Sequence, residues 1–215
     1  MFSSFVNEHK AYISFQPMIG NALLNQDKKY FIAELNDSIQ IDVLSFYISD
    51  ITFLRNDTVV FREDNSYHLI DFTKPVSMRV AVDFGSDITY DKVRFHLGVD
   101  SLTNVSGAMG GDLDPVNGMY WTWQSGYINF KMEGVSQKCP ARNNRFQYHL
   151  GGYQFPFNTL QKIELKTVKK VIQVDVHPEL FFKKVDVSKE FQIMSPSQKA
   201  VQLSETAASL FSVHS

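Results

Sequence analysis

The chain has a single cysteine, Cys139, among its 215 residues, and this excludes a disulfide within the chain. It also lacks the GxSxG, HExxH, P-loop and CxxC patterns that mark well-known hydrolase, metalloprotease, nucleotide-binding and redox sites. No apolar run approaches the roughly 20 residues that span a bilayer. A net charge of −2 provides no basic surface for nucleic acid. We therefore expect no nucleic-acid partner and no transmembrane segment, and no enzyme class is indicated.

What the chain does have is a pattern typical of strands. Alternating or β-branched runs are separated by Asn, Asp, Gly and Pro, as in a protein built from many short strands. The expected strands lie at residues 11–15, 39–53, 66–72, 77–82, 92–99, 119–132, 145–150 and 159–176. We predict an all-β fold, an antiparallel β-sandwich of Ig-like or jelly-roll-like type, with residues 1–215 in one domain.

The last part of the chain indicates a short C-terminal helix. Ser195 can cap it, Pro196 suits its first position, and an alanine-containing run continues to Phe211. Val201, Ala208 and Phe211 can share one face of such a helix. We expect that face to pack on the sandwich.

The most distinctive segment is GMYWTWQSGY at residues 118–127, which contains both tryptophans of the chain. In a strand, Trp121 and Trp123 would point to one face, and Tyr120 and Thr122 to the other. Two indoles on one face are most often packing in a core. An exposed platform that stacks on sugars is the functional alternative.

The sequence around these tryptophans resembles the MbnP-like family, copper-binding proteins associated with methanobactin operons and other copper-homeostasis loci. The similarity covers nearly the whole chain. The segments that carry it are FYISD at 46–50, YHLID at 67–71, FHLGVDS at 95–101, NVSG at 104–107, GDLDPVNGMYWTW at 111–123, SGYI at 125–128, KMEG at 131–134, FQYHLGG at 146–152, MSP at 194–196 and SLFSV at 209–213.

The resemblance implies a copper site that depends on a modified residue. In this family the first tryptophan of the WxW motif is oxidised to kynurenine by a diheme cytochrome c peroxidase-like (MauG-like) oxidase, and that position is Trp121 here. An indole N–H only donates hydrogen bonds, so intact tryptophan is a poor ligand. Ring opening frees an aniline nitrogen. The resemblance also implies a periplasmic or extracellular protein that is not an enzyme. Residues 1–10 do not resemble a signal peptide, and we expect that a signal peptide has been removed from this chain.

Histidines are the natural partners for that nitrogen. None of the six has the HxH or HxxxH spacing of a local metal site, so a site must be assembled across strands. A strand histidine is more often structural than a ligand. The resemblance nevertheless implies that histidines join Trp121, and the candidates in expected strands are His68 and His149, followed by His96. Two imidazoles and an aniline nitrogen would suit one Cu(I) ion.

Two further groups of residues are weaker candidates. The irregular stretch 101–118 is flanked or lined by oxygen donors that could bind calcium, although their spacing matches no defined calcium loop and turn capping is the favoured role; these are Asp100, Asn104, Asp112, Asp114 and Asn117. Cys139 could be a soft copper ligand, but an incidental surface position in a loop is favoured.

Three functions compete at this stage. They are a copper-binding protein, a non-catalytic surface or carbohydrate-binding module that uses Trp121 and Trp123 as an aromatic platform, and an enzyme. The first two make different demands on Trp121. A sugar platform needs exposed indoles, whereas a copper site needs the Trp121 side chain close to metal ligands.

Overall fold

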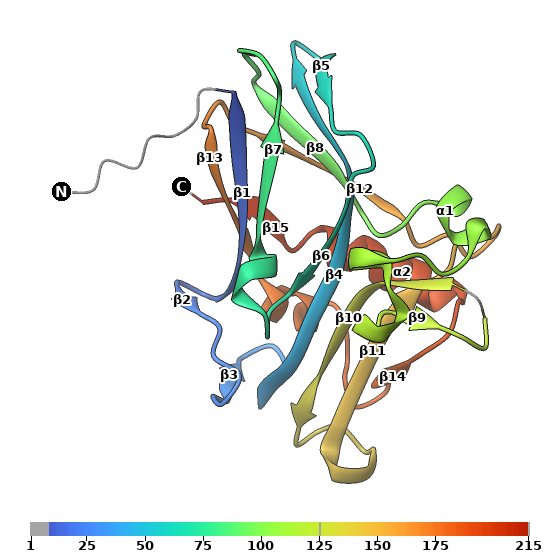
Figure 1. The fold of residues 1–215 in the computed structure, drawn as a ribbon. Helices are drawn as coiled ribbons and strands as arrows, with labels where there is room; N and C mark the ends of the chain where they lie inside the picture. Colours follow the sequence, from blue (N-terminus) through green and yellow to red (C-terminus); the bar gives the residue numbers. More distant parts are fainter. Residues whose placement is uncertain (1–8, 125, 215) are drawn as a thin grey trace.

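The computed structural model describes residues 9–124 and 126–214, and strands dominate it (Figure 1). The large sheet contains β3 (Tyr30–Ile32), β4 (Asp37–Arg55), β5 (Thr58–Arg62), β6 (Tyr67–Asp71), β8 (Lys92–Leu97), β9 (Tyr120–Trp121), β10 (Gly126–Ser136), β11 (Arg145–Gly151), β12 (Gln161–Lys166) and β14 (Gln192–Ile193). The small sheet contains β1 (Lys10–Ile19), β2 (Ala22–Leu23), β7 (Arg79–Asp83), β13 (Val171–Val176) and β15 (Phe211–Val213). The α-helices are α1 (Ser101–Ser106) and α2 (Gln198–Ala208), and the 3-10 helices are η1 (Pro75–Met78), η2 (Gly111–Leu113), η3 (Pro115–Asn117), η4 (Arg142–Asn144) and η5 (Pro178–Lys183).

The large sheet is organised around the long strand β4. Its order is β12-β8-β4-β10-β11-β14, with β3, β5 and β6 also paired to β4 and β9 paired to β10. The small sheet has the order β15-β13-β1-β2, with β7 on β1. Most pairs are antiparallel, but β1 pairs with β13 and β11 pairs with β14 in parallel. The predicted sandwich-like, all-β fold is confirmed, and both sheets are mixed.

The main core lies between the two sheets because strand residues alternate between buried and partly exposed. Along β1, Ala11, Ile13 and Phe15 are buried, and the Phe15 ring meets Phe46 of β4 edge-on at 5.7 Å between centroids. Phe211 of β15 closes on Phe46 at 5.2 Å. Each such buried aromatic side chain contributes about 1.5–3 kcal/mol, so this contact holds the sheets together.

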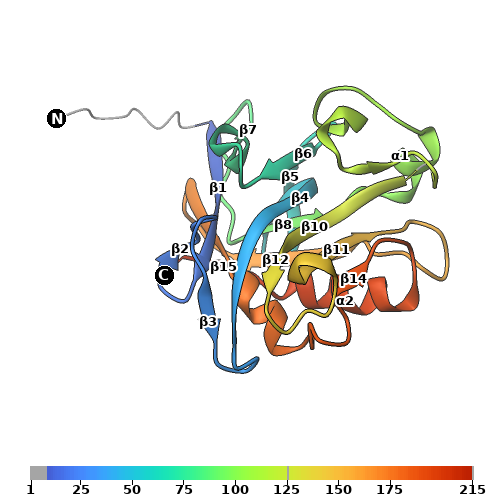
Figure 2. The same ribbon diagram turned by 90° about the horizontal axis from the view of Figure 1, so that it is seen from below.

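A second, smaller core covers the other face of the large sheet. Successive strand residues point to opposite faces, so Tyr47 of β4 joins this cluster while its neighbours Phe46 and Ile48 belong to the main core. The segment between β8 and β10, which includes α1, folds over this face (Figure 2). The cluster consists of Tyr47, Leu69, Val99, Leu113, Met119, Trp121, Tyr127 and Ile128.

The C-terminal helix is present but differs in detail from the prediction. Ser197, not Ser195, caps it: its hydroxyl accepts a hydrogen bond from Ala200 N at 3.1 Å. The helix ends at Ala208, and Phe211 begins a strand instead. Its buried residues, spaced for one helical face that contacts β11 and β12, are Ala200, Leu203, Ser204 and Ala207 rather than Val201 and Ala208.

Two expected strands are each divided in two. Residues 159–176 form β12 in the large sheet and β13 in the small sheet, so the chain crosses between the layers there. Residues 119–132 form β9 and the first part of β10, joined by a tight turn. That turn contains the second tryptophan and therefore decides the geometry of the site.

Candidate metal centre

The two tryptophans lie beside one another, but a turn and not a strand brings them together. Trp121 pairs with Gly126, and the chain turns back directly after it, with Gln124 N donating to Trp121 O at 3.2 Å. The prediction that both side chains leave one strand face is therefore wrong. The indole rings are 5.8 Å apart and tilted by 42°. Trp121 is buried with 6% exposure, whereas Trp123 is 65% exposed.

Trp121 rests on a glycine of β11. A Cβ atom at Gly151 would lie only 2.8 Å from Cζ3 of Trp121 and 2.6 Å from Tyr127 O, so a residue with a side chain cannot occupy this position without displacement. His149 precedes Gly151 by two residues and shares its face of the strand. At about 3.4 Å per residue, the two Cα atoms are about 7 Å apart. His149 therefore lies on the strand that the Trp121 ring contacts, two residues from that contact.

His149 is buried and paired with a carboxylate. Its Nε2 atom lies 2.8 Å from Oε1 of Glu133, which stands on the neighbouring strand β10. The hydrogen bond from His149 lowers the pKa of Glu133 to about 2, against the opposing effect of burial and with help from the charge of Lys131. Glu133 is therefore an ionised acceptor at neutral pH, and one nitrogen of the His149 ring is committed to it.

A methionine follows the strand that pairs with the outer edge of β11. Strand β14 runs parallel to β11, with Gln192 beside Gln147 and Ile193 beside Tyr148. Met194 comes directly after this last pair, and its sulfur accepts a hydrogen bond from Nε2 of Gln192 at 3.3 Å. The sequence offers a hint, since MSP at 194–196 is one of the segments that resemble the MbnP-like family. The β11–β14 pairing thus brings a thioether to the edge of the strand that carries His149.

The other two histidine candidates lie on either side of β4. His68 on β6 and His96 on β8 flank β4, opposite the consecutive residues Ile48 and Ser49. His68 Nε2 lies 2.8 Å from Glu63 Oε2, and burial lowers the pKa of His96 in spite of the Asp50 carboxylate.

The two carboxylates, Glu63 and Asp50, line one polar pocket of about 410 Å³ together with His96. His149 is aligned, through Lys131, with Ser45 of β4. Ser49, which lines the pocket, is four residues from Ser45 along β4, and β4 is two strands away from β11. His149 and Ser49 are therefore about 13 Å apart along the strands and about 10 Å apart across the sheet. His68 and His96 therefore lie in a different part of the sheet from His149.

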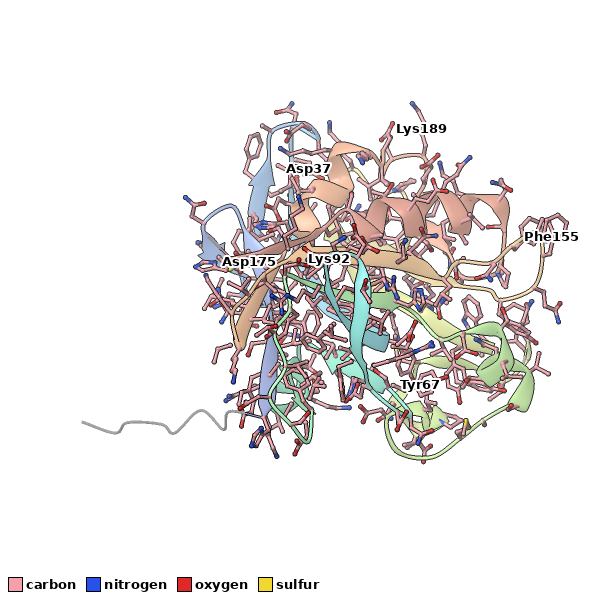
Figure 3. All side chains as sticks on the ribbon, turned by 90° about the horizontal axis from the view of Figure 1, so that it is seen from above. Asp37, Tyr67, Lys92, Phe155, Asp175 and Lys189 are labelled. Atoms are coloured by element: carbon pink, nitrogen blue, oxygen red, sulfur yellow. The ribbon has the colours of Figure 1, made fainter. Side chains whose placement is uncertain are left out.

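The oxygen donors of the 101–118 segment hold the fold together. Asp100 caps α1 and accepts a hydrogen bond from Tyr67, whose side chain points toward this segment (Figure 3). Asp112 Oδ2 accepts from Leu69 N at 2.9 Å, and Asp114 caps η3. The amide groups of Asn104 and Asn117 bond to backbone atoms of the same region. Each residue thus has the capping or bridging role that was favoured over calcium.

Cys139 is not a surface residue, contrary to expectation. It is almost fully buried in the main core, and its thiol donates to Arg145 O at 3.1 Å. A small apolar side chain with one weak donor is well accommodated there. Within residues 9–124 and 126–214, no three His, Cys, Asp or Glu side chains are clustered so that they could hold a metal ion.

A pocket of about 280 Å³ opens beside Trp121. Aromatic, proline and amide side chains line it, including Trp121, Gln124, Tyr153, Phe155, Phe157 and Pro196. Phe155 is 97% exposed and projects from the loop after β11 (Figure 3). One wall of the pocket is thus the buried indole, and its rim carries exposed aromatic surface.

Comparison with known proteins now adds to this geometry. The family model described as MbnP matches residues 8–200. The chain belongs to the MbnP family. A solved structure, MbnP from Methylosinus trichosporium, superimposes with a TM-score of 0.60 at 14% identity, over 83% of this chain and 79% of that one. That likeness confirms the fold. No curated protein sequence matches the chain significantly.

Proposed function

We propose that this MbnP-family protein binds one Cu(I) ion outside the cytoplasm as part of copper homeostasis, and that Trp121 becomes a ligand after oxidation to kynurenine. Family membership supports an association with methanobactin operons. No helix of the described residues is long and apolar enough to cross a membrane. The observation that carries the proposal is the position of Trp121, buried on Gly151 beside His149.

The side chains around Trp121 suit Cu(I) in kind. Imidazole and thioether groups favour this soft ion, and His149 and Met194 supply one of each. The indole of unmodified tryptophan can donate a hydrogen bond but has no lone pair available for a metal ion. The ligand set is therefore incomplete until Trp121 is oxidised. Kynurenine would add an aniline nitrogen. We therefore propose His149, Met194 and modified Trp121 as the ligands.

The modification requires an oxidant, which we propose is a diheme MauG-like partner. Trp121 itself is almost inaccessible, whereas the tilted ring of Trp123 lies beside it and is exposed to solvent. Trp123 can thus pack over the site or assist the removal of electrons from Trp121. The protein itself is proposed to bind metal without catalysing a reaction.

The proposal is tested by copper titration against a competing chelator. Four preparations are compared: the wild type alone, and the wild type, Trp121→Phe and Trp123→Phe proteins co-produced with the oxidase. We expect tight binding, with a change of mass at Trp121, only where the oxidase and Trp121 are both present. Trp123→Phe should retain part of the gain. Equal tight binding by unmodified protein and by Trp121→Phe would refute kynurenine as a ligand.

A second candidate function is carbohydrate binding. The exposed side chains of Trp123 and of Phe155, which lines the pocket, favour it, although Trp121 is too buried to join such a platform. Oligosaccharide titration followed by tryptophan fluorescence tests this alternative. Saturable binding that is lost in Trp123→Ala, with no copper binding by oxidised protein, would favour it over the copper site.

A further inference from the structure

Glu133 lies at the centre of a polar cluster on β10 and β11. Its carboxylate is held by three positively charged or donating groups: Oε1 lies 2.8 Å from His149 Nε2 and 3.5 Å from Lys131 Nζ, and Oε2 lies 3.8 Å from Arg145 Nη2. Lys131 and Glu133 stand on β10, and His149 and Arg145 on β11, so two neighbouring strands fix the arrangement. The carboxylate has little freedom to move.

This arrangement determines which nitrogen of His149 carries the proton. A carboxylate that faces Lys131 and Arg145 acts as a hydrogen-bond acceptor, so Nε2 of His149 donates to Glu133. In a neutral imidazole the other nitrogen, Nδ1, then keeps its lone pair. No hydrogen-bond partner of Nδ1 is found in the part of the chain that the structure describes. Nδ1 is therefore the nitrogen with a lone pair to offer.

The register of the strands points the same way. Glu133 pairs with Gln147, two residues before His149, whereas Gly151 with the Trp121 indole above it lies two residues after. The Nε2 hydrogen bond is thus directed toward the end of β11 that is remote from Trp121. The carboxylate therefore holds the His149 ring on the side away from Trp121. It leaves the space between the imidazole and the indole free.

We propose that Glu133 is the positioning residue of the copper site: it holds the Nε2–H group of His149 and so makes Nδ1 the nitrogen that binds the metal. This inference rests on the proposed copper function. Carboxylates that orient a ligating histidine contribute about 10–100-fold to metal affinity in characterised sites.

The chain offers a matched control. Glu63 makes the same contact with His68, 2.8 Å from Oε2 to Nε2, at the polar pocket near β6. Glu133→Gln and Glu63→Gln therefore remove the same charge from the same kind of pair, next to Trp121 in one case and away from it in the other. Far-UV circular dichroism checks that both variants fold. Glu133→Asp, which keeps the charge but shortens the reach, replaces Glu133→Gln if that variant unfolds.

The first measurement needs no metal and no modification. Long-range ¹H–¹⁵N spectra of the metal-free protein distinguish a protonated ring nitrogen from one with a lone pair. We expect His149 to be protonated at Nε2 alone in the wild type and in Glu63→Gln, and to lose this single tautomer in Glu133→Gln. A proton on Nδ1 of His149 in the wild type would overturn the inference.

The second measurement is the Cu(I) affinity of oxidase-treated protein. Glu133→Gln should bind about 10–100-fold more weakly than the wild type, and Glu63→Gln should bind like the wild type. Because Cu(I) has a filled d shell, spectra of the loaded protein should show Nδ1 of His149 shifted and Nε2 still protonated. Wild-type affinity in Glu133→Gln would refute the role of Glu133 while leaving the copper function intact. Absence of copper binding in the oxidised wild type would refute the copper function itself.

Discussion

Replacing Gly151 by alanine is the sharpest test of how Trp121 is placed. The new methyl carbon would lie 2.8 Å and 3.1 Å from Cζ3 and Cη2 of Trp121, and 2.6 Å from the carbonyl oxygen of Tyr127. Carbon atoms in contact prefer about 3.5–4.0 Å, so the indole must retreat by about 0.7 Å or more. The Tyr127 oxygen belongs to the backbone of β10 and cannot easily move away from the new methyl group.

We expect Gly151→Ala to lower the free energy of unfolding by about 1–3 kcal/mol, the usual cost of an overpacked core. Urea unfolding followed by circular dichroism measures this loss, and tryptophan fluorescence reports the displaced indole. In oxidised protein the same change should weaken copper binding, because Trp121 moves away from His149.

Gly110→Ala serves as the control for Gly151→Ala. Gly110 has an ordinary φ of −94°, and a Cβ atom added there would meet no other atom within 4 Å, so the variant should unfold like the wild type. If Gly151→Ala were as stable as Gly110→Ala and kept the wild-type fluorescence, Trp121 would not rest on β11, and the proposed site would lose its basis.

Three further outcomes follow from the contacts of single residues. Met194→Leu, which is close in volume but has no sulfur, should fold normally and weaken Cu(I) binding by oxidised protein; unchanged affinity in the chelator titration would remove Met194 from the ligand set. Cys139 should react with a thiol reagent only at the rate of unfolding, because its side chain is buried, and fast labelling of native protein would contradict this. Asp112→Ala should cost about 1–3 kcal/mol, since Leu69 N loses its acceptor; a urea midpoint equal to that of the wild type would show that this bridge is dispensable.

Much of the fold could be predicted from the sequence because its signals are local. Alternation of buried and exposed residues, interrupted by Asn, Asp, Gly and Pro, located most strands. The errors were also local. A strand pattern through Trp121 and Trp123 does not reveal that Gln124 bonds back to Trp121 O and turns the chain. The sequence favours Ser195 as the helix cap, whereas in the structure the hydroxyl of Ser197 accepts the hydrogen bond from Ala200 N.

The site was harder to predict because it depends on strand pairing. His149 could be selected as a strand histidine within a family-like motif, and Trp121 as the first tryptophan of WxW. The β9–β10–β11 arrangement places His149 two residues from the glycine beneath the indole, and the parallel pairing of β14 places Met194 at the end of the strand next to β11. Neither arrangement produces a periodic pattern in the sequence from which it could be predicted.

The parallel pairing of β1 with β13 has a consequence for how the chain acquires its structure. Tyr12 is matched with Val171, so the first strand cannot gain this partner until most of the chain is available. Pairing of residues so distant in sequence carries a high cost of loop closure and is associated with slow folding, on the millisecond-to-second scale. During this delay one backbone edge of β1 remains unpaired. A chain shortened before β13 should thus collapse without closing its small sheet, and would expose a ready edge for aggregation.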